Sequence, residues 1–165
     1  MLHSGSMKNQ YITIKRSAIH GKGIYAKKDI PAGTQIIQYV GEKISKKESD
    51  RRLTENEKAG KSVYMFELNS RYDIDGDVSW NPAKYINHTC TPNCHTEIID
   101  NEIWIIAQKN IKKGEELSYD YEFQRADWHK SPCRCNAPSC FGFIVARKYW
   151  SAIKKTKRYQ ALSQA

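Results

Sequence analysis

The cysteines are the first residues in this chain whose type and spacing point to chemistry. Cys133, Cys135 and Cys140 offer three thiolates from one short segment, and a structural zinc site takes four ligands in a closed tetrahedron. Either Cys90 or Cys94 must then supply the fourth ligand. The chain holds 5 cysteines, an odd number, and no secretion signal precedes them, so a disulfide framework is not expected. The alternative is a set of reduced thiols that bind no metal.

Two tyrosines, Tyr119 and Tyr121, form a second candidate site. They stand two positions apart in the strand-like stretch 117–121, so both side chains face the same side. Phenol rings exclude water, and their hydroxyl groups orient a polar partner without adding a fixed charge. Such a pair suits two walls of one narrow channel. For either tyrosine taken alone, ordinary packing in a β-sheet core is the alternative interpretation.

Five sequence blocks occur in an order that resembles a known family. They are Gly21–Ala26 (GKGIYA), Tyr39–Glu42 (YVGE), Asn87–Cys94 (NHTCTPNC), Glu116–Tyr121 (ELSYDY) and Cys133–Cys140 (CRCNAPSC). Over residues 11 to 145 the chain is similar to the SET domain and its post-SET zinc segment, a family of protein-lysine methyltransferases. The resemblance implies transfer of a methyl group from S-adenosylmethionine to a lysine amine on a histone tail. It also implies structural Zn²⁺.

The resemblance assigns roles to individual residues. Tyr121 is expected to be the catalytic tyrosine at the point of methyl transfer, and Tyr39 and Tyr119 are expected to line the lysine channel. The Tyr119 hydroxyl can hold a water where further methyl groups would go, so mainly mono- and some dimethylation is expected. The residues expected to hold S-adenosylmethionine are Lys22, Gly23, Tyr64, Asn87, His88 and Phe143. The expected zinc ligands are Cys94, Cys133, Cys135 and Cys140, which leaves Cys90 as a small buried core residue.

The chain departs from the family pattern at four positions close to these blocks. Lys22 stands where Trp is frequent, Lys84 where Arg is common, Tyr85 where Phe is frequent and Thr89 where Ser is usual. These departures leave the detailed cofactor contacts open. The short insert between Tyr39 and Asn87 holds most of the substrate-facing variation, so the sequence does not define the peptide preference.

Most of the chain is expected to form short strands between turns. Strands are predicted at residues 11–14, 34–40 and 62–68, and a hairpin at residues 97–99 and 102–106 turns at Asp100–Asn101. Helices are predicted at residues 46–59 and from residue 145 towards residue 159. The expected fold is therefore mainly β, the β-clip of small sheets, few short helices and a pseudoknot that the resemblance implies, with a zinc-binding post-SET segment. Expected parts are a cloning remnant (1–6), the SET domain (11–123), the post-SET zinc segment (129–145) and a basic C-terminal helix (146–165).

The charge is unevenly spread over the chain. The net charge is +9, yet residues 29–127 are acidic overall, and residues 128–165 hold eight Lys/Arg and no acid. The acidic block Asp73, Asp75 and Asp77 could receive a basic histone tail. The basic C-terminus could contact nucleosomal DNA, or it could simply be the solvated face of a terminal helix. No apolar run reaches the roughly 18 residues that a membrane span needs, so no membrane partner is expected.

Three hypotheses about function follow from these features. The first is a histone-lysine methyltransferase in the nucleus, on the chromatin of its own cell or of a host cell into which it is delivered. The second is a methyltransferase that acts on a lysine of a non-histone protein. The third is a SET module that has lost catalysis and only binds partners, and the presence of Asn87, Tyr119 and Tyr121 argues against it.

Overall fold

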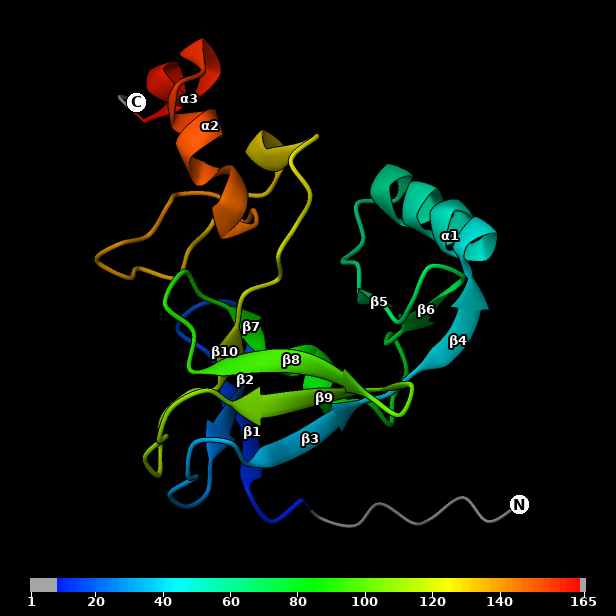
Figure 1. Cartoon of the computed structure of the whole chain (residues 1–165), viewed down its shortest axis with the longest axis vertical. Coiled ribbons are helices and arrows are strands. Elements are labelled where there is room, and N and C mark those ends of the chain that lie inside the picture. The colour runs from blue at the N-terminus through cyan, green and yellow to red at the C-terminus, as the bar shows by residue number, and fades with distance from the viewer. Residues whose placement is uncertain (1–8, 164–165) are drawn as a thin grey trace.

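The computed structural model describes residues 9–163, so the remnant expected at residues 1–6 lies outside the described residues. Within this range the strands form four small sheets, which build the centre of the molecule (Figure 1). Three sheets are antiparallel: β1 (Ile12–Arg16) with β2 (Lys22–Ala26); β3 (Gln35–Tyr39) with β9 (Glu102–Ala107) and β8 (Cys94–Ile99); and β4 (Glu42–Ser45) with β6 (Tyr72–Asp75) and β5 (Met65–Glu67). The prediction of a mainly β fold with small sheets and few helices is confirmed.

The fourth sheet joins β7 (Asn87–His88) to β10 (Ser118–Tyr119) in parallel. Ser118 lies opposite Asn87, and Tyr119 lies opposite His88. The short 3₁₀ helix η1 (Pro82–Tyr85) leads the chain into β7. Backbone pairing therefore fixes Tyr119 of one segment beside the Asn–His pair of the other.

The predicted hairpin is present as β8 and β9. Its turn residues, Asp100 and Asn101, have φ of 50° and 61°, the left-handed values that a two-residue type I′ turn needs at both positions. Elsewhere the strand expected at residues 62–68 is shorter, since β5 covers only Met65–Glu67. The chain turns directly after it, because the N–H groups of Leu68 and Asn69 both donate to the Tyr72 carbonyl.

The first predicted helix is α1 (Lys46–Lys58), and it carries little apolar surface. The Ser45 side chain caps its N-terminus by accepting from the Glu48 N–H, and Gly60 follows its end with φ of 63°. Ser49 is the residue that it buries, so apolar packing holds the helix only weakly. Its position depends instead on ion pairs to the neighbouring sheet.

Two acids of β6 provide those ion pairs. Lys46 bonds to Asp73 at 2.6 Å, and Arg52 bonds to Asp75 at 2.7 Å. The third acid, Asp77, bonds a lysine of η1 at 3.0 Å. All three acids therefore have ion-pair partners within the chain, and their role in receiving a basic histone tail stays a prediction.

The buried apolar residues divide into two cores. The larger one lies among the sheets, and the smaller one lies in the C-terminal region around the cysteines. Fully buried members of the larger core include Ile24, Ile86, Ile105, Ile111 and Leu117. The smaller core consists of Cys90, Trp128, Phe141, Val145 and Ile153, with Phe143, Tyr149, Trp150 and Tyr159 packed against it. The C-terminal segment is thus a packed lobe with its own interior.

The basic C-terminus is not one continuous helix. After the 3₁₀ helices η2 (Trp128–Lys130) and η3 (Arg147–Tyr149), it forms α2 (Trp150–Lys154) and α3 (Lys157–Leu162). The break lies at Thr156, whose N–H and hydroxyl both donate to the Ile153 carbonyl and whose side chain caps α3. A threonine in that role ends one helix and starts the next.

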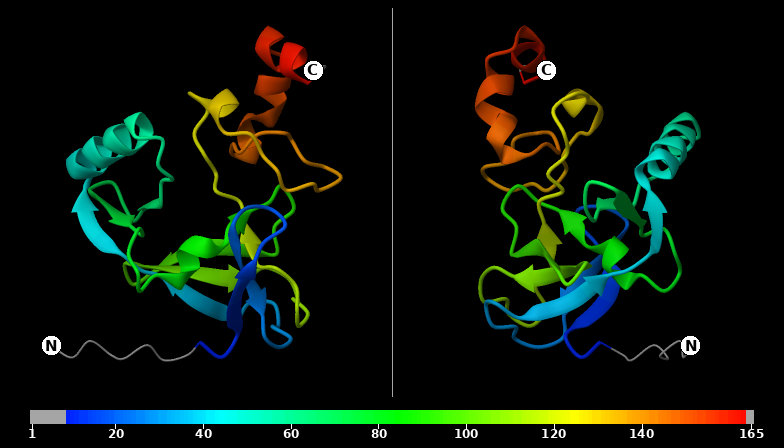
Figure 2. Two further views of the ribbon diagram at one scale, coloured as in Figure 1. Left: turned by 180° about the vertical axis from the view of Figure 1, so that it is seen from behind. Right: turned by 45° about the vertical axis from the view of Figure 1, so that its right-hand side comes forward.

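The helix α1 and the C-terminal helices stand on the same side of β3, β8 and β9, at opposite ends of the molecule (Figure 2). An exposed ion pair between Lys130 of η2 and Glu57 of α1, at 3.3 Å, joins the two regions. Among the described residues no helix is both long and apolar enough to cross a membrane.

Candidate functional site

Two cavities meet at Tyr121. The first, of about 280 Å³, is lined by Tyr39, Tyr64, Phe66, Tyr119 and Tyr121 together with residues of β5 and of the segment after β10. The second, of about 320 Å³, is lined by Ile19, His20, Asn87, His88, Tyr121, Pro132, Cys133, Arg134 and Ile144. Because the Tyr121 side chain lines both, it stands where a group bound in one cavity would meet a group bound in the other.

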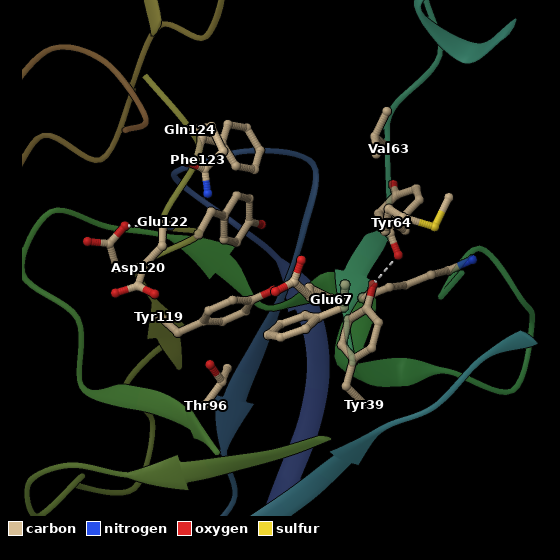
Figure 3. A pocket seen from close by; sticks show the side chains of 14 residues that line it. Tyr39, Val63, Tyr64, Glu67, Thr96, Tyr119, Asp120, Glu122, Phe123 and Gln124 are labelled. Carbon is tan, nitrogen blue, oxygen red and sulfur yellow. Dashed lines mark hydrogen bonds between the residues drawn. The ribbon is translucent and has the colours of Figure 1, made fainter. Parts of the chain in front are cut away.

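The first cavity is walled by aromatic rings. Its buried part holds a chain of three rings, with centroids 5.3 Å apart for Tyr39 and Phe66 and 6.2 Å apart for Phe66 and Tyr119. The ring of Tyr119 then lies 5.0 Å from that of Tyr121. Figure 3 shows Tyr39 and Tyr119 on opposite sides of the pocket. The same-side prediction for Tyr119 and Tyr121 is confirmed, and Tyr39 joins them.

Two of these hydroxyl groups are anchored to backbone carbonyls. The Tyr39 hydroxyl donates to the Tyr64 carbonyl at 2.7 Å (Figure 3), and the Tyr121 hydroxyl donates to the Ile86 carbonyl at 2.9 Å. Burial is the largest cause that raises the pKa of Tyr39, Tyr119 and Tyr121 above the usual value of a tyrosine. All three side chains are therefore neutral at ordinary pH. The cavity offers oriented dipoles without a fixed phenolate charge.

The second cavity is organised by Asn87. Its side-chain amide donates to the backbone carbonyls of His20 at 3.2 Å and Lys22 at 3.0 Å. The same amide nitrogen lies 3.0 Å from the Glu116 carboxylate. A Cβ at Gly23 would clash with that carboxylate, so a larger residue there would displace the Glu116 side chain from Asn87. Asn87 thus fixes the turn that leads into β2 against the segment that precedes β10.

His88 holds Tyr121 in place through a hydrogen bond and a ring contact. Burial lowers the pKa of His88 to about 4, so the ring is neutral near pH 7. Its Nδ1 accepts the Tyr121 N–H at 3.2 Å, and the two rings lie 5.4 Å apart, edge to face. The side chain therefore positions Tyr121 rather than acting as a base.

The residues predicted to hold a cofactor are only partly brought together. Asn87 and His88 line the second cavity, whereas Tyr64 lines the first. The carbonyl of Lys22 faces Asn87, but the Lys22 ammonium lies over the Tyr85 ring, 5.0 Å from its centroid. Phe143 packs on Trp128 with centroids 4.7 Å apart, next to the cavity-lining Ile144. The cofactor roles of these six residues stay predictions.

The cysteine cluster differs from the predicted one. Cys90, Cys133, Cys135 and Cys140 place their sulfur atoms within 4.8 Å of one another. Cys94 is not part of this group, so its assignment as the fourth zinc ligand is wrong, and the expectation that Cys90 is only a core residue is wrong as well. The physical reason is direction: β8 begins at Cys94 and turns its side chain into the larger core, whereas Cys90 faces the smaller one.

The chemistry of the four thiols suits a soft metal ion. All four donors are sulfur, and three come from one segment while the fourth comes from the loop after β7. Burial works to raise the pKa of Cys135, but hydrogen bonds from the backbone N–H groups of Cys90 and Ala137 lower it to about 7. At least one thiolate is therefore accessible near neutral pH. Thiolates are the form that binds metal.

The sequence did not single out several residues that line the first cavity. Val63, Glu67, Asp120, Glu122 and Phe123 all lie there. Asp120 is the one whose position gave a signal, since it stands between Tyr119 and Tyr121. The others lie in parts of the chain where no motif marks a role, and only the folded arrangement gathers them.

A comparison with protein families and with characterised proteins agrees with this geometry. The family model described as the SET domain matches residues 21–122. Histone-lysine N-methyltransferase 2D of Homo sapiens is 41% identical over 134 residues, and histone-lysine N-methyltransferase trr of Drosophila melanogaster is 45% identical over 134 residues. A histone-lysine N-methyltransferase of Aspergillus oryzae, named as H3 lysine-4 specific, is 40% identical over 141 residues.

The aligned segments cover most of this chain but little of those relatives. They cover 78%, 78% and 81% of this chain, and 2%, 6% and 11% of the human, fly and fungal proteins respectively. The family match, by contrast, includes Asn87, Tyr119 and Tyr121, which the structure brings together around the two cavities. The chain belongs to the SET-domain family.

Proposed function

We propose that this protein is an S-adenosylmethionine-dependent protein-lysine N-methyltransferase. The observation that carries the proposal is the place of Tyr121, which lines both cavities and is fixed by Ile86 and His88. S-adenosylmethionine supplies a methyl group on a sulfonium, and the neutral thioether that departs when the S–CH₃ bond breaks is a good leaving group. Most of what remains for the protein is placement and exclusion of water.

Each of the two cavities would bind one of the two reactants. The second cavity, with Asn87 and His88, would hold the methyl donor, and the first cavity would admit the lysine side chain. A lysine amine must lose its proton from a pKa near 10.4 before it can attack. Aromatic walls with neutral hydroxyl groups favour the uncharged amine, because a dry channel disfavours the ammonium form. Tyr121 and Tyr119 would orient the amine in line with the methyl group.

Methylation assays on purified protein test this activity. Core histones, intact nucleosomes and a cell lysate are incubated with labelled S-adenosylmethionine, and the modified sites are mapped by mass spectrometry. Transfer to lysine is expected with the wild-type protein. A calorimetric titration that detects no binding of S-adenosylmethionine would contradict the proposal and favour the SET module that only binds partners.

The substrate we propose is a histone tail. The named relatives are histone-lysine N-methyltransferases, and the body of this chain carries a net negative charge that attracts basic peptides. A lysine of a non-histone protein is the second candidate. The same assay separates the two, because strong labelling of a lysate protein with unlabelled histones would favour the second.

We further propose that monomethyl-lysine is the main product, with some dimethyl-lysine. Tyr119 lines the first cavity, and its hydroxyl has no hydrogen-bond partner within the described part of the chain. That hydroxyl can hold a water in the space that additional methyl groups would need. Tyr119→Phe should therefore shift the product towards di- and trimethyl-lysine in mass spectra. Equal trimethylation by wild type and variant would contradict this assignment.

The four-sulfur cluster is proposed to bind structural Zn²⁺ through Cys90, Cys133, Cys135 and Cys140. A bound ion would join the loop after β7 to the C-terminal lobe, and so hold Cys133 and Arg134 at the second cavity. Metal analysis of purified protein should give one zinc per chain. A protein that lacks zinc but keeps full activity would contradict the proposed structural role.

The basic C-terminus is proposed to contact nucleosomal DNA, which places the protein on chromatin, in its own cell or in a host cell that receives it. Lys148, Lys154, Lys155, Lys157 and Arg158 are exposed in the C-terminal lobe, and no acid lies between residues 128 and 165. Replacing the last four by glutamine should weaken binding to DNA and flatten its salt dependence. Peptide methylation should not change. Unchanged DNA binding would instead identify these residues as a solvated surface.

A further inference from the structure

The mouth of the first cavity is apolar on both sides. Val63 and Phe123 line the cavity, and they are 42% and 41% exposed. Val63 belongs to the loop after α1, whereas Phe123 belongs to the segment after β10. Figure 3 shows the two side chains on opposite sides of the pocket. Exposed apolar groups that flank a cavity are a common sign of a binding surface.

Phe123 is also the outermost ring of a ladder. Tyr119, Tyr121 and Phe123 follow at every second position, and their ring centroids are 5.0 Å and 5.6 Å apart. Tyr119 is 8% exposed and Phe123 is 41% exposed, so the ladder runs from the buried end of the cavity to solvent. A peptide whose lysine enters along this ladder must place a neighbouring residue against Phe123.

A carboxylate without an ion-pair partner stands beside these groups. Glu122 also lines the cavity, and no ion pair to it exists between residues 9 and 163. Its backbone has φ of 51° and is held there by an N–H bond of 3.0 Å to Asp120. A non-glycine residue in that conformation is strained and is often found at a functional site.

The other charged groups around the cavity are paired or less exposed: Asp120 is 23% exposed, lies beside His88 and accepts the Glu122 N–H at 3.0 Å. Glu67 bonds to Lys46 at 2.7 Å, and Lys84 bonds to Asp77 at 3.0 Å. Glu122 is therefore the exposed carboxylate of the lining that has no ion pair among the described residues, and it is available to a cation of the substrate. The mouth thus combines apolar contact area with one negative charge.

We propose that the mouth of the first cavity selects a peptide with an apolar side chain immediately beside the target lysine and a basic side chain close to it. The apolar side chain packs against Val63 and Phe123, and the basic one pairs with Glu122. This inference rests on the proposed lysine methylation and specifies the substrate class of that same site.

Kinetics with a small set of peptides tests the inference. The peptides differ only in the residue beside the lysine, which is leucine, serine or aspartate, or in a nearby residue, which is arginine or glutamine. The wild-type protein should prefer leucine over serine about fivefold in kcat/KM. That is less than the ~10–200-fold that an enclosed apolar pocket gives per methylene group, because the mouth stays partly hydrated.

Matched variants assign the preference to residues. Val63→Thr keeps the side-chain shape but removes apolar surface, so it should reduce the leucine preference, and so should Phe123→Ala. Glu122→Gln should remove the preference for arginine over glutamine. The controls are Ile98→Thr, at an apolar side chain 51% exposed on β8, and Glu115→Gln, at an exposed carboxylate away from the cavity. Both controls should keep the wild-type ratios.

The outcomes separate this inference from the activity itself. Methylation of all peptides at equal kcat/KM by the wild-type protein would overturn the inference and leave the proposed activity intact. Loss of the preferences in the controls as much as in the mouth variants would also overturn it. If no peptide or protein lysine is methylated, the proposed function fails, and the inference fails with it.

Discussion

Tyr121 is the residue on which the site depends most directly. Its ring lines both cavities, its hydroxyl donates to the Ile86 carbonyl, and its N–H donates to His88. A residue held by these two hydrogen bonds can orient a reacting amine with little loss of freedom at the moment of reaction. The ring maintains the wall of the channel, while the hydroxyl supplies the directed contact.

Tyr121→Phe should separate the role of the ring from the role of the hydroxyl group. The phenyl ring keeps the wall, so the fold and peptide binding should persist, whereas kcat should fall by about 10²–10³-fold as expected when one directed hydrogen-bonding group at the reacting centre is lost. Steady-state kinetics with circular dichroism measures both. Tyr11→Phe, at a tyrosine outside both cavities, is the matched control. A kcat within threefold of wild type would show that the hydroxyl has no catalytic role.

The buried tyrosines also determine the pH profile. Their pKa values lie above the usual value for tyrosine because of burial, so they keep their protons up to about pH 10. The lysine amine must instead lose its proton. The rate should therefore rise between pH 7 and pH 9 without a falling limb from tyrosine ionisation. A maximum below pH 9 in a protein that remains folded would contradict this.

Loss of protein stability should limit the methylation rate at high pH. Burial raises the pKa of Cys94 to about 12, whereas a thiol in the unfolded chain titrates near 9. The folded protein therefore keeps this proton when the unfolded chain has lost it. The free energy of unfolding should decrease as the pH rises above about 9. Denaturant titrations at pH 8 and pH 10 measure the decrease.

At the scale of elements, the start of β8 decides which of the two cores each of two nearby cysteines enters. Cys90 lies in the loop before the strand and faces the smaller core, while Cys94 lies at the start of the strand and faces the larger core. Cys90→Ser should therefore lower the zinc content and, with it, the affinity for S-adenosylmethionine. Cys94→Ala is the control, because it should destabilise the fold but retain zinc. Zinc loss in Cys94→Ala but not in Cys90→Ser would contradict the cluster.

The short helix α2 matters more than its length suggests. Ile153 is 0% exposed and lies in the smaller core with Trp128 and Phe141. Arg147, just before α2, donates to the Cys90 carbonyl at 2.7 Å and so ties the segment to the cysteine loop. The C-terminal helices are thus part of the lobe that borders the second cavity.

Ile153→Ala should loosen that lobe. Removal of a fully buried isoleucine side chain down to Cβ costs about 2–5 kcal/mol. We expect a lower free energy of unfolding and weaker binding of S-adenosylmethionine, measured by denaturant titration and calorimetry. Ala152→Gly, at an exposed position of the same helix, is the control for helix propensity and should cost about 1 kcal/mol. Unchanged stability in Ile153→Ala would contradict the packing role of α2.

At the scale of the whole molecule, α1 and the C-terminal lobe stand at opposite ends of the same side of the central sheets and are joined by the exposed Lys130–Glu57 ion pair. The two side chains are 53% and 71% exposed, so water and salt screen their attraction. Such a pair contributes at most about 1 kcal/mol. The relative position of the two regions should therefore depend mainly on the sheets beneath them.

Glu57→Gln tests that conclusion. The variant should change kcat/KM for a peptide by less than about threefold, and the wild-type protein should lose little activity between low and moderate salt. Lys112→Met, which removes the comparably exposed pair with Asp29, is the control. A tenfold loss in Glu57→Gln alone would mean that the ion pair, rather than the sheets, fixes the relative position of the two regions.

Local patterns in the sequence predicted local structure well. The hairpin at Asp100–Asn101, the helix from Lys46 and the same-side placement of Tyr119 and Tyr121 all depend on residues close in the chain. Backbone preferences and strand alternation act over such distances, so the sequence contains them directly. The break between α2 and α3 was missed because the side-chain bond that caps α3 competes with helix propensity.

The sequence by itself determined the family and the mainly β fold. It also indicated that Tyr39, Tyr119 and Tyr121 line one cavity and that Cys133, Cys135 and Cys140 lie in one cluster. Only the tertiary structure decided that Cys90 rather than Cys94 completes the cluster, that Asp73 and Asp75 bind α1, and that Val63, Glu122 and Phe123 share one cavity. The physical reason is that motif spacing fixes which residues are near in the chain. The direction of a side chain and its distant partners depend on how strands and loops pack.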